Sequence, residues 1–166
     1  MATYDWSRFS TRINISADFK DIYGALTTRA GLERWFLRTA EFSTTSKIVR
    51  GPYDGIAAGD AYRWLWFGYD DSVVETGSVL EVNGKDLLRF TFAGSCVVTV
   101  TVKIESGETI VELQQENIPL DEDARVHYHL GCLTGWTFYL ANLKSVLEGG
   151  IDLRNKNKEI QKVVNA

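Results

Sequence analysis

The stretch DEDARVHYHLGCLTGWTFYLANLKSVLE, from Asp121 to Glu148, decides the fold of this chain. Large apolar residues recur in it at steps of three and four, namely Leu133, Trp136, Leu140, Leu143 and Leu147. This spacing places them on one stripe of an α-helix, which we expect to run from roughly Asp123 to Glu148. A single long helix that follows a run of strands must bury such a stripe against the sheet that those strands form.

Most of the chain before this helix has the alternation of apolar and polar residues that is typical of strands. The predicted strands cover Arg8–Ser16, Ala61–Phe67, Val73–Val82, Asp86–Phe92, Val97–Ile104 and Thr109–Glu116, with a weak one over Glu41–Thr45. Two short helices are expected after the first strand, one through Ile22–Leu26 and one over Ala30–Phe36. Asn83-Gly84 is a strong hairpin signal, so its flanking strands should pair antiparallel. The predicted class is α+β, with an antiparallel sheet of about six or seven strands.

The length of 166 residues fits a single domain. Its core should span residues 8–150, and residues 151–166 should form a C-terminal extension, either a short extra helix or a frayed tail. The Gly- and Pro-containing segment Ser46–Asp60 is an unusually long loop, and its part Gly51–Asp60 should form either a lid over a site or a plain surface connection.

Composition excludes several classes of partner. The net charge of −4 argues against nucleic acid, because phosphate binding requires clustered Lys and Arg. No apolar run approaches the ~20 residues that span a bilayer, so no membrane partner is expected. The N-terminus lacks the basic and apolar regions of a signal peptide, which favours a cytoplasmic location. Cys96 and Cys132 then fit buried, reduced thiols.

Several short motifs, taken in order, make the chain resemble a known family. They are Leu32–Phe36 (LERWF), Gly77–Val82 (GSVLEV), Leu88–Phe92 (LRFTF) and Gly135–Gly150 (GWTFYLANLKSVLEGG). Together they resemble the START-like superfamily and, within it, the family related to the activator of Hsp90 ATPase. The resemblance covers roughly Ser10–Arg154, which is most of the chain.

This resemblance implies the helix-grip fold, a curved antiparallel sheet wrapped round a long C-terminal helix, often with an apolar cavity between them. Family members include lipid carriers and stand-alone bacterial proteins of unknown ligand and, more distantly, polyketide cyclases and plant hormone receptors. Two features depart from the pattern. The chain leaves no room for the separate Hsp90-binding domain of the eukaryotic co-chaperone, and Ala58-Gly59-Asp60 replaces the usual Gly-Gly. Fold similarity alone does not imply function.

Large aromatic residues gather at positions that should face the helix. Tyr62, Trp64 and Trp66 share one face of their strand, and this suits either a ligand-binding wall or a well-filled core. Arg63, between them, should point outward to solvent, or inward as a carboxylate anchor if the register is reversed. The residues predicted to line a ligand site are Trp35, Phe36, Tyr62, Trp64, Trp66, Phe90, Phe92, His129, Trp136 and Tyr139.

The histidines and the buried amide are the remaining chemical candidates. His127 and His129 are two residues apart on the helix, so they cannot form the i, i+4 pair of a zinc helix. His129 falls on the apolar stripe and is expected to line the cavity, as a hydrogen-bond partner or general base, or else to be a satisfied buried residue. Gln115 shares a strand face with Val111 and Leu113. Its amide should therefore lie either among apolar groups or in water at the end of the strand.

The sequence therefore favours binding of a small hydrophobic or amphipathic molecule between sheet and helix. A chaperone-associated or stress-linked interaction role is the first alternative, and a cyclase- or hydrolase-type enzyme with His129 as base is the second. No motif for a catalytic residue, metal or cofactor is present. A homodimer that pairs through sheet edges is a further expectation.

Overall fold

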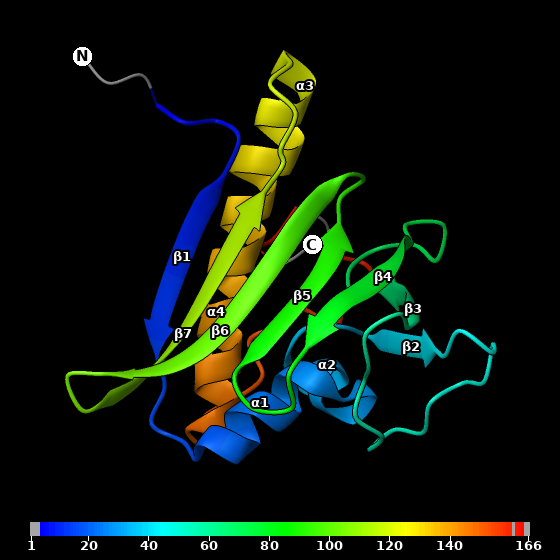
Figure 1. Cartoon of the computed structure of the whole chain (residues 1–166). Helices are drawn as coiled ribbons and strands as arrows, with labels where there is room; N and C mark the ends of the chain where they lie inside the picture. Colours follow the sequence, from blue (N-terminus) through cyan, green and yellow to red (C-terminus); the bar gives the residue numbers. More distant parts are fainter. Residues whose placement is uncertain (1–3, 161, 165–166) are drawn as a thin grey trace.

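The computed structural model describes residues 4–160 and 162–164 (Figure 1). Seven strands form one antiparallel sheet in the order β1-β7-β6-β5-β4-β3-β2. They are β1 (Phe9–Asn14), β2 (Thr39–Ser43), β3 (Ala61–Leu65), β4 (Glu75–Val82), β5 (Leu87–Phe92), β6 (Cys96–Glu105) and β7 (Glu108–Glu116). The predicted sheet and the Asn83-Gly84 hairpin between β4 and β5 are both confirmed.

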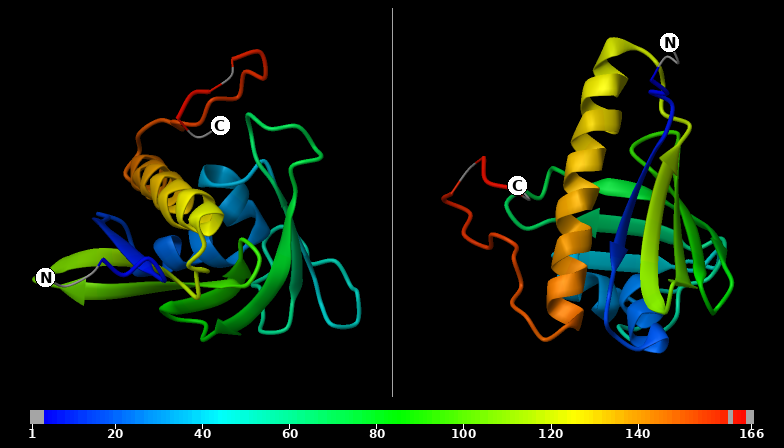
Figure 2. Two further views of the ribbon diagram at one scale, coloured as in Figure 1. Left: turned by 90° about the horizontal axis from the view of Figure 1, so that it is seen from above. Right: turned by 90° about the vertical axis from the view of Figure 1, so that its left-hand side faces the viewer.

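The helices occupy the positions that the sequence predicts. The short helices α1 (Phe19–Thr27) and α2 (Arg29–Trp35) follow β1. The long helix has three consecutive parts: α3 (Glu122–Ala124), the π-helical segment Arg125–Gly131 and α4 (Cys132–Leu147). Figure 2 shows the sheet bending around this helix, which confirms the helix-grip fold. No described helix is both long enough and apolar enough to cross a membrane.

The core fills the concave side of the sheet. Strand alternation directs Val98, Val100 and Val102 of β6 inward, where all three are buried. From α4, Leu140 and Leu143 pack into the same core. Arg63 points outward and pairs with Glu41, with 3.7 Å between the charged groups, so the predicted outward register of β3 is correct.

The loop between β2 and β3 is firmly attached to the rest of the fold. Arg50 donates two hydrogen bonds to the buried Asp60 carboxylate, one of them at 2.9 Å. The backbone N–H of Ile56 donates to the carbonyl of Thr27 at 3.0 Å, and Ala30 N–H donates to the carbonyl of Pro52 at 2.8 Å. The two backbone bonds tie the loop to α1 and α2, so a plain, packed connection describes it better than a lid.

The described part of the C-terminal extension has no helix, so the extra helix predicted as one alternative is wrong for these residues, and residues 152–154 are held in place by hydrogen bonds. The buried Asn142 side chain accepts a hydrogen bond from Leu153 N–H at 2.7 Å and donates one to Asp152 at 3.1 Å. Arg154 is buried and donates to backbone carbonyls at the end of α2, those of Glu33, Arg34 and Leu37.

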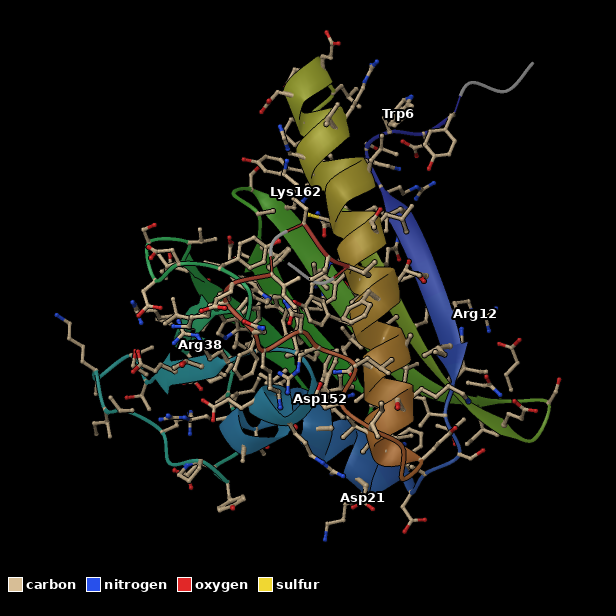
Figure 3. All side chains as sticks on the ribbon, turned by 180° about the vertical axis from the view of Figure 1, so that it is seen from behind. Trp6, Arg12, Asp21, Arg38, Asp152 and Lys162 are labelled. Carbon is tan, nitrogen blue, oxygen red and sulfur yellow. The ribbon has the colours of Figure 1, made fainter. Side chains whose placement is uncertain are left out.

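Burial alone would raise the pKa of Asp152. Hydrogen bonds from Arg154, Lys156 and Asn142 outweigh that effect and hold the pKa of this carboxyl well below its ordinary value. Figure 3 shows the extension returning from Asp152 toward Lys162 on the side of the long helix where β2 and β3 lie. The extension is thus attached to the end of α2 by the buried Arg154 guanidinium, which pairs with the partly buried Asp152 carboxylate.

Candidate functional site

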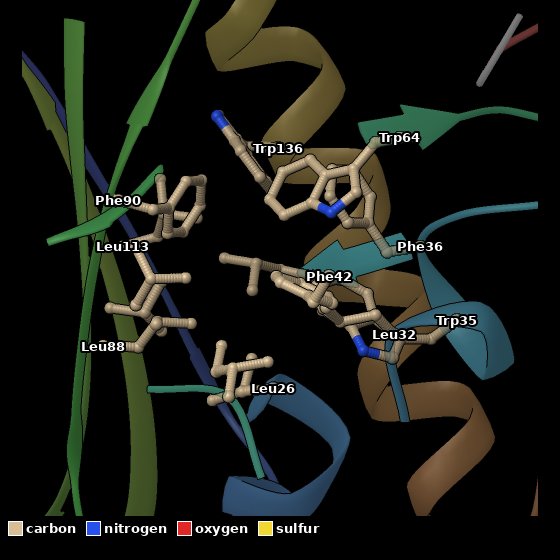
Figure 4. A pocket seen from close by; sticks show the side chains of 14 residues that line it. Leu26, Leu32, Trp35, Phe36, Phe42, Trp64, Leu88, Phe90, Leu113 and Trp136 are labelled. Carbon is tan, nitrogen blue, oxygen red and sulfur yellow. The ribbon is translucent and has the colours of Figure 1, made fainter. Parts of the chain in front are cut away.

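Two spaces lie between the sheet and the long helix. The first, here called the inner hollow, is enclosed by apolar side chains (Figure 4). It is lined by Leu26, Leu32, Trp35, Phe36, Phe42, Ile56, Trp64, Val79, Leu88, Phe90, Val100, Leu113, Trp136 and Leu140. It leaves only about 20 Å³ for the centre of a water-sized sphere. A single water molecule needs about 10–15 Å³ by this measure, so the hollow is nearly filled by its own walls.

The second space, here called the outer groove, is separated from the first by the rings of Phe36 and Trp136 and is far larger. It offers about 450 Å³ by the same measure. Its lining comes from α4 and its π-helical segment, the β3–β4 connection, β5 and the C-terminal extension. The lining residues are Phe36, Trp66, Tyr69, Val73, Phe92, His127, Gly131, Cys132, Thr134, Gly135, Trp136, Phe138, Tyr139, Val163 and Val164.

Phe36 and Trp136 line both spaces and form the wall between them. Their ring centroids are 4.9 Å apart. Trp136 is fixed in place because its indole N–H donates to the amide oxygen of the fully buried Gln115 at 3.1 Å. The amide nitrogen of Gln115 donates in turn to the carbonyl of Tyr128 at 3.1 Å. Phe36 has no polar group and is held only by packing.

The outer groove has a mainly apolar surface with a few polar groups. Phe36, Trp66 and Phe92 supply large apolar areas, and Tyr69 and His127 are partly or largely exposed to solvent. Burial raises the pKa of the Tyr69 hydroxyl, which is therefore a neutral donor at physiological pH. Burial likewise raises the pKa of the Cys132 thiol to about 11. The groove can thus take an apolar body and hydrogen-bond a polar end at its rim.

His129 does not line either space, contrary to the prediction. It is fully buried, and its Nδ1 lies 3.0 Å from the carbonyl oxygen of Trp6. Its Nε2 lies 2.8 Å from the hydroxyl of Tyr4. The rings of Tyr4, Trp6 and Phe9 surround the imidazole at centroid distances of 5.1–5.4 Å. Both ring nitrogens are engaged, so His129 anchors the N-terminal segment and is not placed to act as a base in either space.

Tyr62 is also outside both linings. Its ring stacks on Trp64 with centroids 3.9 Å apart, and its hydroxyl donates to the carbonyl of Thr91. Burial raises the pKa of this phenol far above its ordinary value. The structure therefore places Tyr62 as a support behind the wall of the hollow.

The structure sorts the remaining predicted residues into two groups. Trp35, Trp64 and Phe90 line the inner hollow, whereas Trp66, Phe92 and Tyr139 line the outer groove. Sequence reasoning missed several groove residues, among them Tyr69, Gly135, Phe138, Val163 and Val164. Gly135 carried a usable signal, because a glycine inside a helix often has a packing or functional reason. The valines of the extension carried none.

Within the described residues, no group of three or more His, Cys, Asp or Glu side chains is arranged to hold a metal ion.

Comparison with known proteins agrees with this geometry. Residues 16–148 match the family described as Activator of Hsp90 ATPase homolog 1-like protein. The chain belongs to this family. No curated protein matches it at the sequence level.

Solved structures of low sequence identity share the fold of this family member. A protein from Staphylococcus saprophyticus is 18% identical with a TM-score of 0.68, over 89% of this chain and 96% of that one. The Aha1 dimer from Colwellia psychrerythraea is 21% identical with a TM-score of 0.65, over 86% and 97%. DynU16, from the dynemicin biosynthetic locus, is 18% identical with a TM-score of 0.65, over 90% of this chain and 50% of that one.

Proposed function

We propose that the protein binds a small hydrophobic or amphipathic molecule in the outer groove. One observation carries this proposal: the groove offers about 450 Å³, whereas the inner hollow offers about 20 Å³. Ligand pockets for small molecules typically measure roughly 300–1,000 Å³ and have mainly apolar walls with a few polar groups. The outer groove meets both conditions.

The ligand gains affinity mainly from apolar area removed from water, at roughly 25 cal/mol per Å². Its apolar part rests against Phe36, Trp66 and Phe92, the large rings of the groove. Its polar end lies at the rim, where Tyr69 and His127 reach solvent. This arrangement favours amphipathic molecules such as fatty acids or aromatic acids over fully polar ones.

Gly135 offers a direct way to block the groove. It lies in α4 and lines the groove, and a Cβ built on it meets no heavy atom within 4 Å. Gly135→Phe should fill part of the groove without disturbing the core. Ala141→Phe is the matched control, because Ala141 is an exposed residue of the same helix that lines neither space.

The test screens both variants and the wild type against fatty acids, sterols and aromatic acids, by thermal shift and by tryptophan fluorescence. We expect hits with the wild type and with Ala141→Phe, and a loss of affinity of at least about tenfold with Gly135→Phe, because the added ring excludes the ligand sterically. No binding by the wild type to any compound would reject the proposal. Equal binding by all three proteins would place the ligand elsewhere.

A second candidate function is docking to a chaperone, and a different surface favours it. Ile48, Val49 and Tyr53 in the β2–β3 loop are exposed, Tyr53 to 84% of its full area. Exposed large apolar side chains on one loop are a feature of protein interaction sites. The test measures binding of purified Hsp90 by calorimetry. Binding to the wild type that is lost in the double variant Ile48→Ser/Tyr53→Ser would support this role. No binding heat with the wild type would reject it.

A further inference from the structure

Trp64 carries a buried polar group that no other described residue uses. The side chain is only 3% exposed, and its indole N–H has no hydrogen-bond partner within the described part of the chain. The great majority of buried polar groups in proteins are hydrogen-bonded, because an unsatisfied donor costs about 1–3 kcal/mol. An unused donor at this position therefore requires a reason.

The two other tryptophans of the inner hollow show the contrast. Trp35 donates its indole N–H to the carbonyl of Ala25 at 2.9 Å, and Trp136 donates to Gln115 at 3.1 Å. In Figure 4 the indole nitrogen of Trp136 points away from the hollow, whereas that of Trp64 lies among the surrounding apolar side chains. Of these three donors, only that of Trp64 is free.

Water is a poor partner for this donor. The hollow has room for about one water molecule, but a buried water needs about 2–4 polar partners. All the side chains of the lining are apolar apart from the tryptophan N–H groups, and two of those are already engaged. A water beside Trp64 would therefore have a single side-chain partner there. An acceptor atom attached to an apolar molecule does not have this problem.

We propose that Trp64 is a specificity-determining residue whose indole N–H donates a hydrogen bond to a neutral acceptor, a carbonyl or ether oxygen, on an apolar ligand. This proposal rests on the proposed function and names the chemical class of the ligand. The acceptor is neutral because a carboxylate in this apolar hollow would lose its hydration and gain only one hydrogen bond. A charged end stays in the outer groove.

The ligand reaches Trp64 past Phe36. Phe36 and Trp136 separate the hollow from the outer groove, and only Trp136 has a hydrogen bond that holds its ring in place. The indole N–H of Trp64 is covered by its neighbours in the structure, so a ligand would reach it only when the Phe36 ring rotates toward the groove and joins the two spaces. The apolar end of the ligand then lies in the hollow, with its oxygen beside Trp64.

The test compares two probes that differ only in the acceptor: 2-nonanone, and 2-methyl-1-nonene, in which a CH₂ group replaces the oxygen. Nonanoic acid is the charged third probe. We expect the wild type to bind the ketone about threefold to tenfold more tightly than the alkene, in keeping with the net value of a buried hydrogen bond. In Trp64→Phe this ratio should fall to about one. In Trp35→Phe, which enlarges the same hollow, both affinities should change together and keep their ratio.

A second measurement does not depend on any variant's folding. The indole N–H signal of Trp64 in a proton–nitrogen NMR spectrum should move downfield with the ketone and not with the alkene. Equal affinities for the two probes, or an unmoved Trp64 signal with bound ketone, would overturn the proposal while leaving binding in the groove intact. If neither probe nor any compound of the larger panel binds, both proposals fail.

Discussion

The inner hollow and the outer groove share two aromatic rings but are built differently. The hollow lies deep between sheet and helix, and residues from many elements fill it almost completely. The groove is lined largely by α4, the β3–β4 connection and the C-terminal extension, and it stays open. Side chains from helices and strands fill the inner hollow. The outer groove, part of whose lining comes from the irregular β3–β4 connection and the extension, remains open. The difference shows that the larger of the two spaces, the one with the volume of a small-molecule pocket, lies next to the core.

The separation between these spaces depends on Phe36, and its removal should have the largest effect. Phe36 contacts five aromatic rings, those of Trp35, Trp64, Trp66, Trp136 and Tyr139. Phe36→Ala should lower the free energy of unfolding by about 4 kcal/mol, as expected for a buried phenylalanine. Chemical denaturation measures this.

The matched control is Phe138→Ala, which truncates a partly buried ring that lines only the groove. Phe138→Ala should lower the free energy of unfolding clearly less than Phe36→Ala does. Equal losses for the two variants would show that Phe36 is not a core residue of the dividing wall.

The outer groove depends on the attachment of the extension, which supplies Val163 and Val164. Arg154→Met should lower the free energy of unfolding by about 3 kcal/mol, because it leaves Asp152 and the carbonyls at the end of α2 without their main donor. The control is Lys156→Met, which removes an exposed partner of the same carboxylate and should cost less than about 1 kcal/mol. Calorimetric unfolding measures the stability of both variants. Similar losses of stability in the two would contradict the attachment through buried Arg154.

Acid should loosen the same attachment. The pKa of Asp152 is depressed in the folded protein, so its contribution to stability is fully present above its ordinary pKa of 3.8 and is lost as the pH falls below that value. We expect the stability difference between wild type and Asp152→Asn to be constant near neutral pH and to shrink progressively in acid below about pH 4. A difference that does not vary with pH would show that the carboxylate charge plays no part.

The smallest effect concerns the chemistry of the groove wall. Because burial raises the pKa of Cys132 to about 11, iodoacetamide should alkylate it on the order of 100-fold more slowly at pH 7.5 than an unperturbed thiol. Mass spectrometry over a pH series should show the rate rising up to about pH 11. Cys96, which is fully buried, is the internal control and should stay unmodified. Rapid labelling of Cys132 at neutral pH would mean that its thiol is more accessible to water than its burial in the groove wall indicates.

The fold could be predicted because local patterns and global architecture agree. Alternation in Val97–Ile104, the Asn83-Gly84 turn and the apolar stripe of the long helix each indicate the observed element. The site was predicted only partly. Alternation shows that Trp64 and Trp66 share a face, but Trp66 lies beyond the end of β3, so one ring lines the hollow and the other the groove.

His129 was misplaced for a physical reason. The prediction extended the α-helical spacing of Trp136 backward by seven residues to His129. The segment Arg125–Gly131 is π-helical, and a π-helix takes more residues per turn, so α-helical spacing from Trp136 does not predict the direction of His129, which packs against Tyr4, Trp6 and Phe9. Nothing in the composition of this segment signals the wider turn. The role of Val163 and Val164 likewise depends on the long-range contact of Arg154 with α2, which periodicity cannot reveal.

The attachment of Arg154 has a thermodynamic consequence. The carbonyls that it binds belong to Glu33, Arg34 and Leu37, the residues on either side of Phe36, and the extension that it holds also supplies part of the groove. A molecule in the groove therefore contacts both partners of that docking equilibrium. Linkage is reciprocal, so if docking of Asp152–Arg154 on α2 raises the affinity for this molecule, binding of the molecule must stabilise that docking by the same factor. A bound molecule should then slow cleavage of the extension by a carboxypeptidase.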